Sequence, residues 1–187
     1  MWAMKRFMLW LRQLLGSRGG PQGSVRKEGS MCEQYDPHDI LERLKSAVAE
    51  MGRRFAEDPT QPHLVMGYGG KNGNYSCVLQ VHMEYPLIVF HSYVQCCVPE
   101  EKRVVMAEFL TRANSRLSLG NFELDFSDGV IRYKTSLHIG DGLLTTEMLS
   151  AMLGANVGTI DHYLPGIMSV LWNDVSAEDA VGLCEAP

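Results

Sequence analysis

Residues 63–98 constrain the fold most strongly, because three consecutive runs there are rich in β-branched and aromatic residues and are separated only by short turns. The runs are HLVMGY, NYSCVLQVHMEY and LIVFHSYVQCCV. GGKNGN provides the first turn and Tyr85-Pro86 the second. Connections this short join antiparallel neighbours, since parallel strands need a long crossover. We therefore predict a three-stranded antiparallel meander.

Apolar residues at helical spacing flank the meander on both sides. Asp36-Pro37 favours a helix start, because aspartate accepts a hydrogen bond at the N-cap and proline follows where no N–H is needed. This helix is predicted to end at AEDPTQP. Pro99 stops the third strand and begins a second helix, with Glu100 and Glu101 in its first turn. The two apolar stripes are Ile40, Leu41, Leu44, Ala47, Val48, Met51 and Phe55, and then Val105, Met106, Phe109, Leu110, Ala113 and Leu117.

The stretch from Arg112 to Gly142 alternates charged with apolar residues around an Asp-Gly pair, which predicts a β-hairpin. Placing Asp128-Gly129 as a two-residue type I′ turn makes the numbers of paired residues sum to 257. Each charged pair contributes about 0.2–1 kcal/mol on a solvated face, so we interpret these charges as scaffold. The predicted pairs are Asp125–Arg132, Glu123–Lys134, Phe126–Ile131 and Leu124–Tyr133.

The remaining C-terminal part is predicted to be helical. Thr145 caps a helix whose apolar pattern continues to Leu171, and Pro165 either kinks this helix or begins a second one. The sequence SAED at 176–179 resembles a capping box and starts a short last helix. The predicted order is αβββαββα followed by a further helix, and antiparallel strands separated by helices indicate the α+β class.

Charge is divided unevenly along the 187 residues. Six Lys or Arg and one acid give residues 1–30 a net charge of +5, so the formal charge of −5 for the chain leaves −10 for residues 31–187. We predict a basic amphipathic arm and linker over residues 1–30 and one domain over residues 31–187. An acidic body without a basic stripe interleaved with aromatics argues against a nucleic-acid partner.

Residues 1–15 show an imperfect amphipathic pattern opposite their basic residues. Arg12 breaks the apolar run before the about 20 residues that a transmembrane helix needs, and no small-x-small cleavage site of a secretory signal follows. Three interpretations remain open: a helix at a membrane surface, a helix that docks on a partner, or a misassigned start, because a linker-like stretch leads directly to Met31. The apolar stripe is Met4, Phe7, Met8, Leu11, Leu14 and Leu15.

Two stretches invite a catalytic interpretation. GYGGKNGN follows a strand, but Asn72 stands where G-x-G-x-x-G needs glycine, and a strand follows instead of a helix, so we interpret it as a turn. Asp161 and His162 are adjacent, and adjacent helical residues point about 100° apart, so Asp161 cannot orient His162 as in a catalytic triad. Asp161 is predicted to cap the helix before Pro165. We predict no catalytic residue.

Histidines and cysteines do not form a metal-binding pattern. The six histidines are scattered, and His82 and His91 lack a third ligand at plausible spacing. The five cysteines are odd in number and contain no C-x-x-C. Because free cysteine is usually buried, we predict reduced thiols in a cytoplasmic protein, with no metal and no cofactor.

Several stretches after Pro99 resemble the YbjN family, whose fold is similar to that of type III secretion chaperones. They are RANSRLSLGNFELDFSDGVIRYKTSL, GLLTTEML, TIDHYLPGIMSVL and VSAEDAV. The similarity covers residues 36–183, and the basic arm departs from the compact pattern of the family. The matching residues are Asn114, Leu119, Gly120, Phe122, Glu123, Gly129, Arg132, Leu137, Asp161, Tyr163, Pro165 and Ala180.

The resemblance implies a bacterial, cytoplasmic, non-enzymatic regulator of sensory transduction, whose chaperone relatives bind partner proteins, often as dimers. We predict a protein-binding module, regulator or chaperone-like adaptor that accepts an unidentified protein, or a second copy, on its sheet face or strand edges. Candidates on the meander are Tyr68, Tyr75, Tyr93 and Val94, but the sequence does not show which face is outward, so none is assigned as a binding residue. A regulator tethered to a membrane surface through residues 1–15 is the alternative, and an unrecognised enzyme is the third hypothesis.

Overall fold

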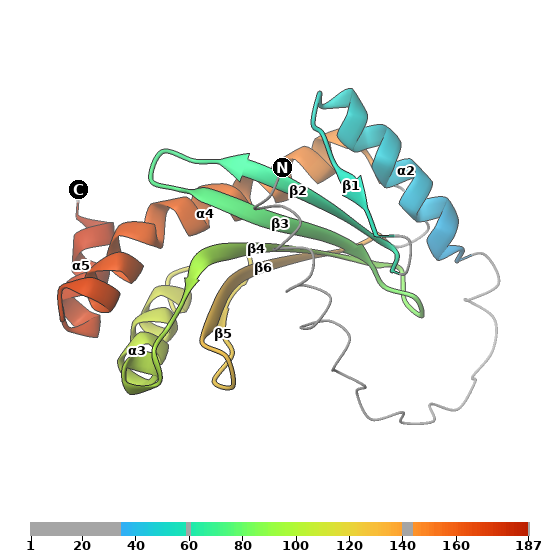
Figure 1. Cartoon of the computed structure of the whole chain (residues 1–187). Coiled ribbons are helices and arrows are strands. Elements are labelled where there is room, and N and C mark those ends of the chain that lie inside the picture. The colour runs from blue at the N-terminus through green and yellow to red at the C-terminus, as the bar shows by residue number, and fades with distance from the viewer. Residues whose placement is uncertain (1–34, 59–60, 140–143, 187) are drawn as a thin grey trace. The chain divides into compact units, whose positions relative to one another are not determined.

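The computed structural model describes residues 35–58, 61–139 and 144–186. The predictions for residues 1–30, and Cys32, lie outside these ranges. The described strands form one six-stranded antiparallel sheet in the order β1-β2-β3-β4-β6-β5, and helices lie along one side of it (Figure 1). The predicted α+β class, the meander and the order of the predicted elements are confirmed, with β1 as an added strand. The elements are α2 (Pro37–Glu50), β1 (Ala56–Glu57), β2 (His63–Gly69), β3 (Asn74–Val81), β4 (Leu87–Cys97), the 3₁₀ turn η1 (Glu100–Lys102), α3 (Arg103–Asn114), β5 (Asn121–Leu124), β6 (Val130–His138), α4 (Thr146–Trp172) and α5 (Ala177–Glu185).

Helix α2 begins as predicted but ends earlier. The carboxylate of Asp36 accepts the backbone N–H of His38, at 2.9 Å, and Pro37 occupies the first turn. At the other end Gly52 takes a positive φ of 67°, and Arg53 N–H donates to the carbonyl of Val48 at 3.1 Å. These are the left-handed residue and the long hydrogen bond of a Schellman ending. The prediction that the helix extends to Phe55 is therefore wrong.

Strand β1 was missed by the sequence analysis. It has only two residues, Ala56 and Glu57, which pair with Val65 and Leu64 of β2. The AEDPTQP stretch was assigned to the end of a helix, and two residues are too few to show a strand periodicity.

The β5–β6 hairpin folds back where predicted, but its register differs by two residues. The numbers of paired residues sum to 255, so Glu123 lies opposite Arg132 and Leu124 opposite Ile131. Asp125 is in the turn instead of the ladder, because its carboxylate accepts the N–H of Ser127 at 2.9 Å and its carbonyl accepts the N–H of Gly129 at 2.8 Å. A shift of two residues keeps every side chain on its predicted face, so the faces were right and the pairs wrong.

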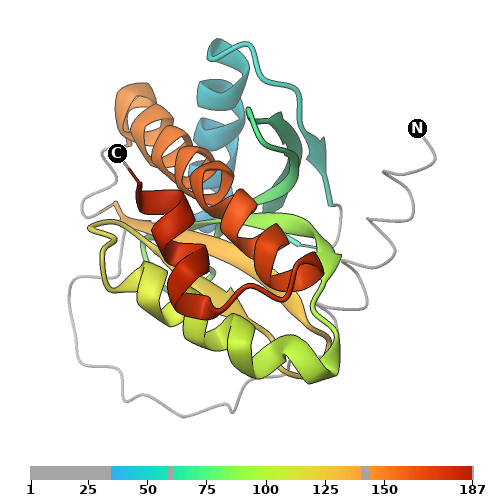
Figure 2. The same ribbon diagram turned by 90° about the vertical axis from the view of Figure 1, so that its left-hand side faces the viewer.

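The core lies between the sheet and its helices. Helices α2, α3 and α4 lie on one face of the sheet, and α5 packs against α3 and α4 (Figure 2). Phe90 of β4, Phe109 of α3 and Ile160 of α4 are fully buried in this layer. Helix α4 is one continuous helix that contains Pro165, so the alternative in which a second helix begins there is wrong.

Candidate protein-binding surfaces

The glycine-rich turn between β2 and β3 binds an anion, and that anion is the side chain of Asp161 in α4. The Asp161 carboxylate accepts three backbone N–H groups, from Lys71 at 2.9 Å, Asn72 at 2.9 Å and Gly73 at 3.1 Å, and the hydroxyl of Tyr75 at 2.8 Å. Successive backbone N–H groups of a turn form a concavity that favours an anion. The turn thus uses the chemistry of a phosphate-binding loop to join the sheet to α4.

Close approach explains why the turn is rich in glycine. A Cβ atom at position 70 would overlap the Asp161 carboxylate, and one at position 73 would lie 2.5 Å from a methyl group of Leu164. Side chains at these positions would push the turn away from α4.

Asp161 does not cap a helix as predicted, because it lies inside α4. Burial alone would raise the pKa of Asp161, but the bonds from Tyr75 and from the N–H groups of Asn72, Lys71 and Gly73 outweigh it and hold that pKa below its usual value. The Asp161 carboxylate thus accepts four hydrogen bonds within the fold. His162, its neighbour in sequence, is exposed.

A second polar cluster is buried between the sheet and α4. The side-chain amide nitrogen of Asn156 donates to Thr135 Oγ1 at 3.0 Å and to the carbonyl of Phe90 at 3.2 Å. Its oxygen accepts the hydroxyl of Ser92 at 2.5 Å, and that hydroxyl lies 3.1 Å from the Cys77 thiol. Burial raises the pKa of Cys77 to about 12, which keeps it a neutral thiol. These groups orient one another inside the core and are closed to a substrate.

The charged residues of the hairpin lie on the sheet face opposite the described helices. Glu123 pairs with Arg132, at 2.6 Å, and with Lys134, so the predicted Glu123–Lys134 ion pair exists as a diagonal contact. Burial would raise the pKa of Glu123, but hydrogen bonds and charge from the two cations lower it to about 2. Burial and the nearby Arg132 lower the pKa of His91 to about 4. These residues stabilise the strand pairing, as predicted from the sequence.

The four meander residues suggested for docking do not provide a surface. Tyr68, Tyr75 and Val94 belong to the core under the helices, with exposed fractions of 8%, 3% and 5%. Tyr93 lies opposite Arg132 on the other face and is also buried. These four candidates are therefore buried in the described structure. The sequence left the outward face undetermined, because strand periodicity does not show which face the helices cover.

One strand edge is closed by a side chain. The amide oxygen of Asn114 accepts the N–H of Phe122 at 2.7 Å, and its amide nitrogen donates to the carbonyl of Phe122 at 3.1 Å. The Asn114 side chain thus occupies the backbone groups through which an added strand would pair with β5. Asn114, one of the residues that carry the sequence resemblance, therefore caps the outer edge of β5.

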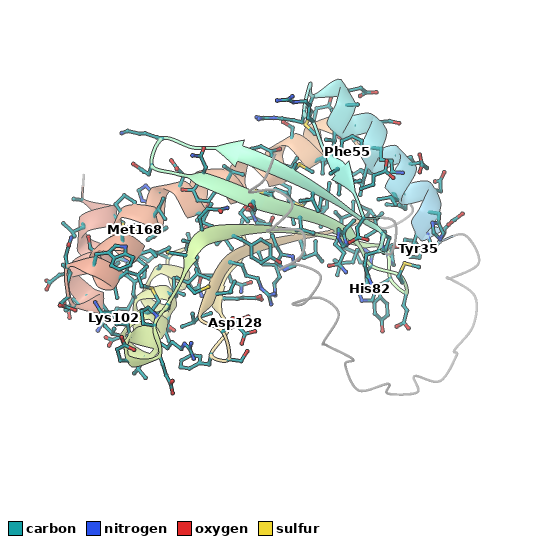
Figure 3. The ribbon with its side chains drawn as sticks, in the orientation of Figure 1. Tyr35, Phe55, His82, Lys102, Asp128 and Met168 are labelled. Atoms are coloured by element: carbon teal, nitrogen blue, oxygen red, sulfur yellow. The ribbon has the colours of Figure 1, made fainter. Side chains whose placement is uncertain are left out.

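Three exposed apolar side chains lie where α3, α4 and the β5–β6 turn come together. Their exposed fractions are 74% for Val104, 55% for Phe126 and 69% for Trp172. Figure 3 labels Lys102 and Asp128, which lie in this part of the domain. We call Val104, Phe126 and Trp172 the apolar end. The sequence analysis missed these residues, although Val104 departs from the buried stripe of α3 and Trp172 is the last residue of α4.

No group of three or more His, Cys, Asp or Glu in residues 35–58, 61–139 and 144–186 is arranged to hold a metal ion. Over the same ranges, no helix has the length and hydropathy needed to span a membrane.

Comparison with known proteins identifies the class and then the family. The antiparallel sheet with one helical layer matches the crystal structure of YbjN, described as a putative transcription regulator from E. coli, with a TM-score of 0.53 and 16% identity over 71% of this chain and 89% of that one. The model of the YbjN family, described as "Putative bacterial sensory transduction regulator", matches residues 41–168. The chain belongs to the YbjN family.

Two further solved structures are similar. A chain of the HopA1–SchA chaperone–effector complex has a TM-score of 0.45 and 11% identity, covering 66% of this chain and 93% of that one. A chain of the ExsC–ExsE complex has a TM-score of 0.44 and 12% identity, covering 65% and 88%. No curated protein matches the sequence.

Proposed function

We propose that this chain is a non-enzymatic protein-binding module, a bacterial regulator or chaperone-like adaptor that acts through protein–protein contacts in the cytoplasm. The observation that supports this most directly is the set of large apolar side chains that the domain exposes. Exposed apolar surface that gathers in one place is typical of interaction sites. In the described part of the chain the exposed large apolar residues are Met83, Tyr85, Val104, Leu119, Phe126, Met148, Trp172 and Leu183. Three of them, Val104, Phe126 and Trp172, lie at the apolar end, and these three support the proposal.

The polar groups best placed for chemistry already have structural partners. Asp161 is held by the β2–β3 turn, Glu123 by two cations, and Asn156 by a buried network. A catalytic site needs a nucleophile or base that is free to meet a substrate. These three groups are fully engaged inside the fold, which favours binding over catalysis.

The experiment is quantitative cross-linking and affinity purification of the full chain from its native host. We expect a protein partner in stoichiometric amount, or a self-dimer. A Leu44→Asp chain, with a charge in the α2 core, serves as the control for proteins that bind any unfolded bait. Recovery of a monomer without a partner at native concentration would overturn the proposal, and so would equal recovery by the control.

A second candidate function is regulation at a membrane surface through residues 1–15. The net charge of +5 over residues 1–30 and the apolar stripe within residues 1–15 favour binding to anionic lipid. The full chain should float with vesicles containing phosphatidylserine and not with neutral phosphatidylcholine vesicles. Replacing Lys5, Arg6 and Arg12 with glutamine should abolish flotation. Equal flotation of both forms would exclude this role for the arm.

A further inference from the structure

We propose that the apolar end binds a basic amphipathic helix of a partner protein. The proposal rests on the protein-binding function above and assigns its surface and the chemistry of its ligand.

Two cationic side chains hold the three elements of the apolar end together. The Lys102 ammonium donates to the last carbonyls of α4, at 2.6 Å from Leu171 O and 3.2 Å from Val170 O. The guanidinium of Arg103 donates to the carbonyl of Phe126 at 2.7 Å. Val104 directly follows Arg103, which binds Phe126. Trp172 directly follows Leu171, whose carbonyl binds Lys102. The exposed side chains are anchored on one rigid junction.

The backbone at this junction is already satisfied. Lys102 occupies the carbonyls at the C-terminal end of α4, and Arg103 occupies the carbonyls of Phe126 and, at 3.2 Å, of Val98. The junction consists of helix ends and a turn, so it has no strand edge for an extended peptide. A ligand buried here must satisfy its own backbone hydrogen bonds, and a helix does so. The three side chains can receive the apolar face of a helix.

Acidic residues surround the apolar end. Glu100 and Glu101 are exposed just before Val104, and Asp174 lies two residues after Trp172. Asp174 binds Lys102 at 2.7 Å, and Asp128 is half-buried in the β5–β6 turn. Arg103 donates to carbonyls, and Lys102 is shared between the carbonyls of α4 and Asp174. Glu100, Glu101 and Asp128 therefore leave the surroundings of the apolar end net acidic. A second copy would bring the same acids against one another, whereas a helix with Lys or Arg beside its apolar face is complementary.

The test uses Trp172 as its own reporter. A full chain with Trp2→Phe and Trp10→Phe leaves Trp172 as its single tryptophan. It is titrated with a 14-residue peptide of leucine and lysine at amphipathic helical spacing. We expect a blue shift of the Trp172 emission, a gain of peptide helicity by circular dichroism, and weaker binding as salt is raised. The matched peptide with glutamate in place of lysine should bind at least tenfold more weakly.

Variants locate the site. By fluorescence anisotropy of the labelled peptide, Val104→Ala and Trp172→Ala should each raise the Kd about tenfold or more, as truncation of a buried anchor does. Glu100→Gln combined with Glu101→Gln should weaken binding at low salt only. Leu183→Ala, which truncates another exposed apolar residue on α5, is the matched control and should bind as the parent does.

Equal affinity for the two peptides, or an unchanged Kd in Val104→Ala and Trp172→Ala, would overturn the proposal. Self-association that is lost in Trp172→Ala would instead assign the surface to a second copy and also overturn it. The native partner separates this result from the proposed function. If Trp172→Ala still recovers that partner in stoichiometric amount, the binding function stands and the surface is wrong.

Discussion

The side-chain amide of Asn72 donates to the backbone carbonyl of Asp161 at 2.8 Å, and this bond replaces one that the helix lacks. In a regular helix the carbonyl of residue 161 would accept the N–H of residue 165. Pro165 has no N–H. A proline inside α4 thus frees a carbonyl for the β2–β3 turn, while the carboxylate of the same aspartate binds the backbone of that turn. Through its carboxylate and its carbonyl, Asp161 therefore joins α4 to the β2–β3 turn of the sheet, and Pro165 leaves the carbonyl available for this contact.

The first prediction is a coupling between Asn72 and Pro165. In the parent chain, Asn72→Ala should lower the free energy of unfolding by about 1 kcal/mol, because it leaves the carbonyl of Asp161 unpaired. In a Pro165→Ala chain the N–H of residue 165 can donate to the carbonyl of Asp161. Asn72→Ala should then lower the free energy of unfolding by about half as much or less. A double-mutant cycle from urea denaturation measures the difference. Equal costs in both backgrounds would refute the replacement of one bond by the other.

The second prediction concerns the carboxylate of Asp161. Asp161→Ala should lower the free energy of unfolding by about 3 kcal/mol, because it leaves three N–H groups and the Tyr75 hydroxyl without their acceptor. His162→Ala, at the exposed neighbour, should change it by less than about 0.5 kcal/mol. Denaturant midpoints followed by circular dichroism test this pair. Similar midpoints for the two variants would show that the turn holds its place without Asp161.

The sequence analysis recognised elements better than the contacts between them. Helix starts at Asp36 and Thr145 and the strands of the meander follow from local capping and periodicity, and all of them are present. The partnership of Asp161 with a turn 90 residues away has no local signal. The one sequence feature related to this contact was a glycine-rich turn that lacks the pattern of a phosphate-binding loop. The predicted hairpin register was wrong for a similar reason. Asp125 binds within its own turn, and the carbonyl of Gly129 accepts the N–H of Val98, just after β4.

Burial was the other property that local pattern could not supply. The tyrosines of the meander were candidates because a partner can dock on apolar side chains of an open sheet face. Tyr68 and Tyr75 are instead covered by helices that are distant in sequence. Val104 and Trp172 looked like ordinary helix residues, yet both are exposed, Val104 where α3 begins and Trp172 where α4 ends. Which apolar residues remain outside is decided when the layers pack.

A third prediction addresses the buried network around Asn156. Asn156→Ala should lower the free energy of unfolding by about 3 kcal/mol, because Thr135 and Ser92 lose a buried partner and a cavity is left behind. Ser150→Ala, at an exposed position of the same helix, is the matched control and should have little effect. Thermal and urea unfolding of both variants measure the difference. A cost below about 1 kcal/mol for Asn156→Ala would mean that the network contributes little to stability.

The last prediction is a dependence on pH that originates at Glu123. The folded-state pKa of this carboxyl is lowered to about 2 by Lys134 and Arg132, against the effect of burial, whereas in the unfolded chain its pKa is near the ordinary value of 4.5. The unfolded state therefore binds a proton first as pH falls, so the stabilising contribution is fully present above about 4.5 and is lost between that pH and about 2.

Glu123→Gln removes this titration and keeps the shape of the side chain. The difference in unfolding free energy between parent and variant should be constant near pH 7, about 3 kcal/mol in favour of the parent, and should shrink towards zero as pH falls to about 2. Glu108→Gln, at an exposed ion pair on α3, should give a difference below about 1 kcal/mol at every pH. A parent–variant difference for Glu123 that stays flat down to pH 2 would show that its cations do not stabilise the ionised form.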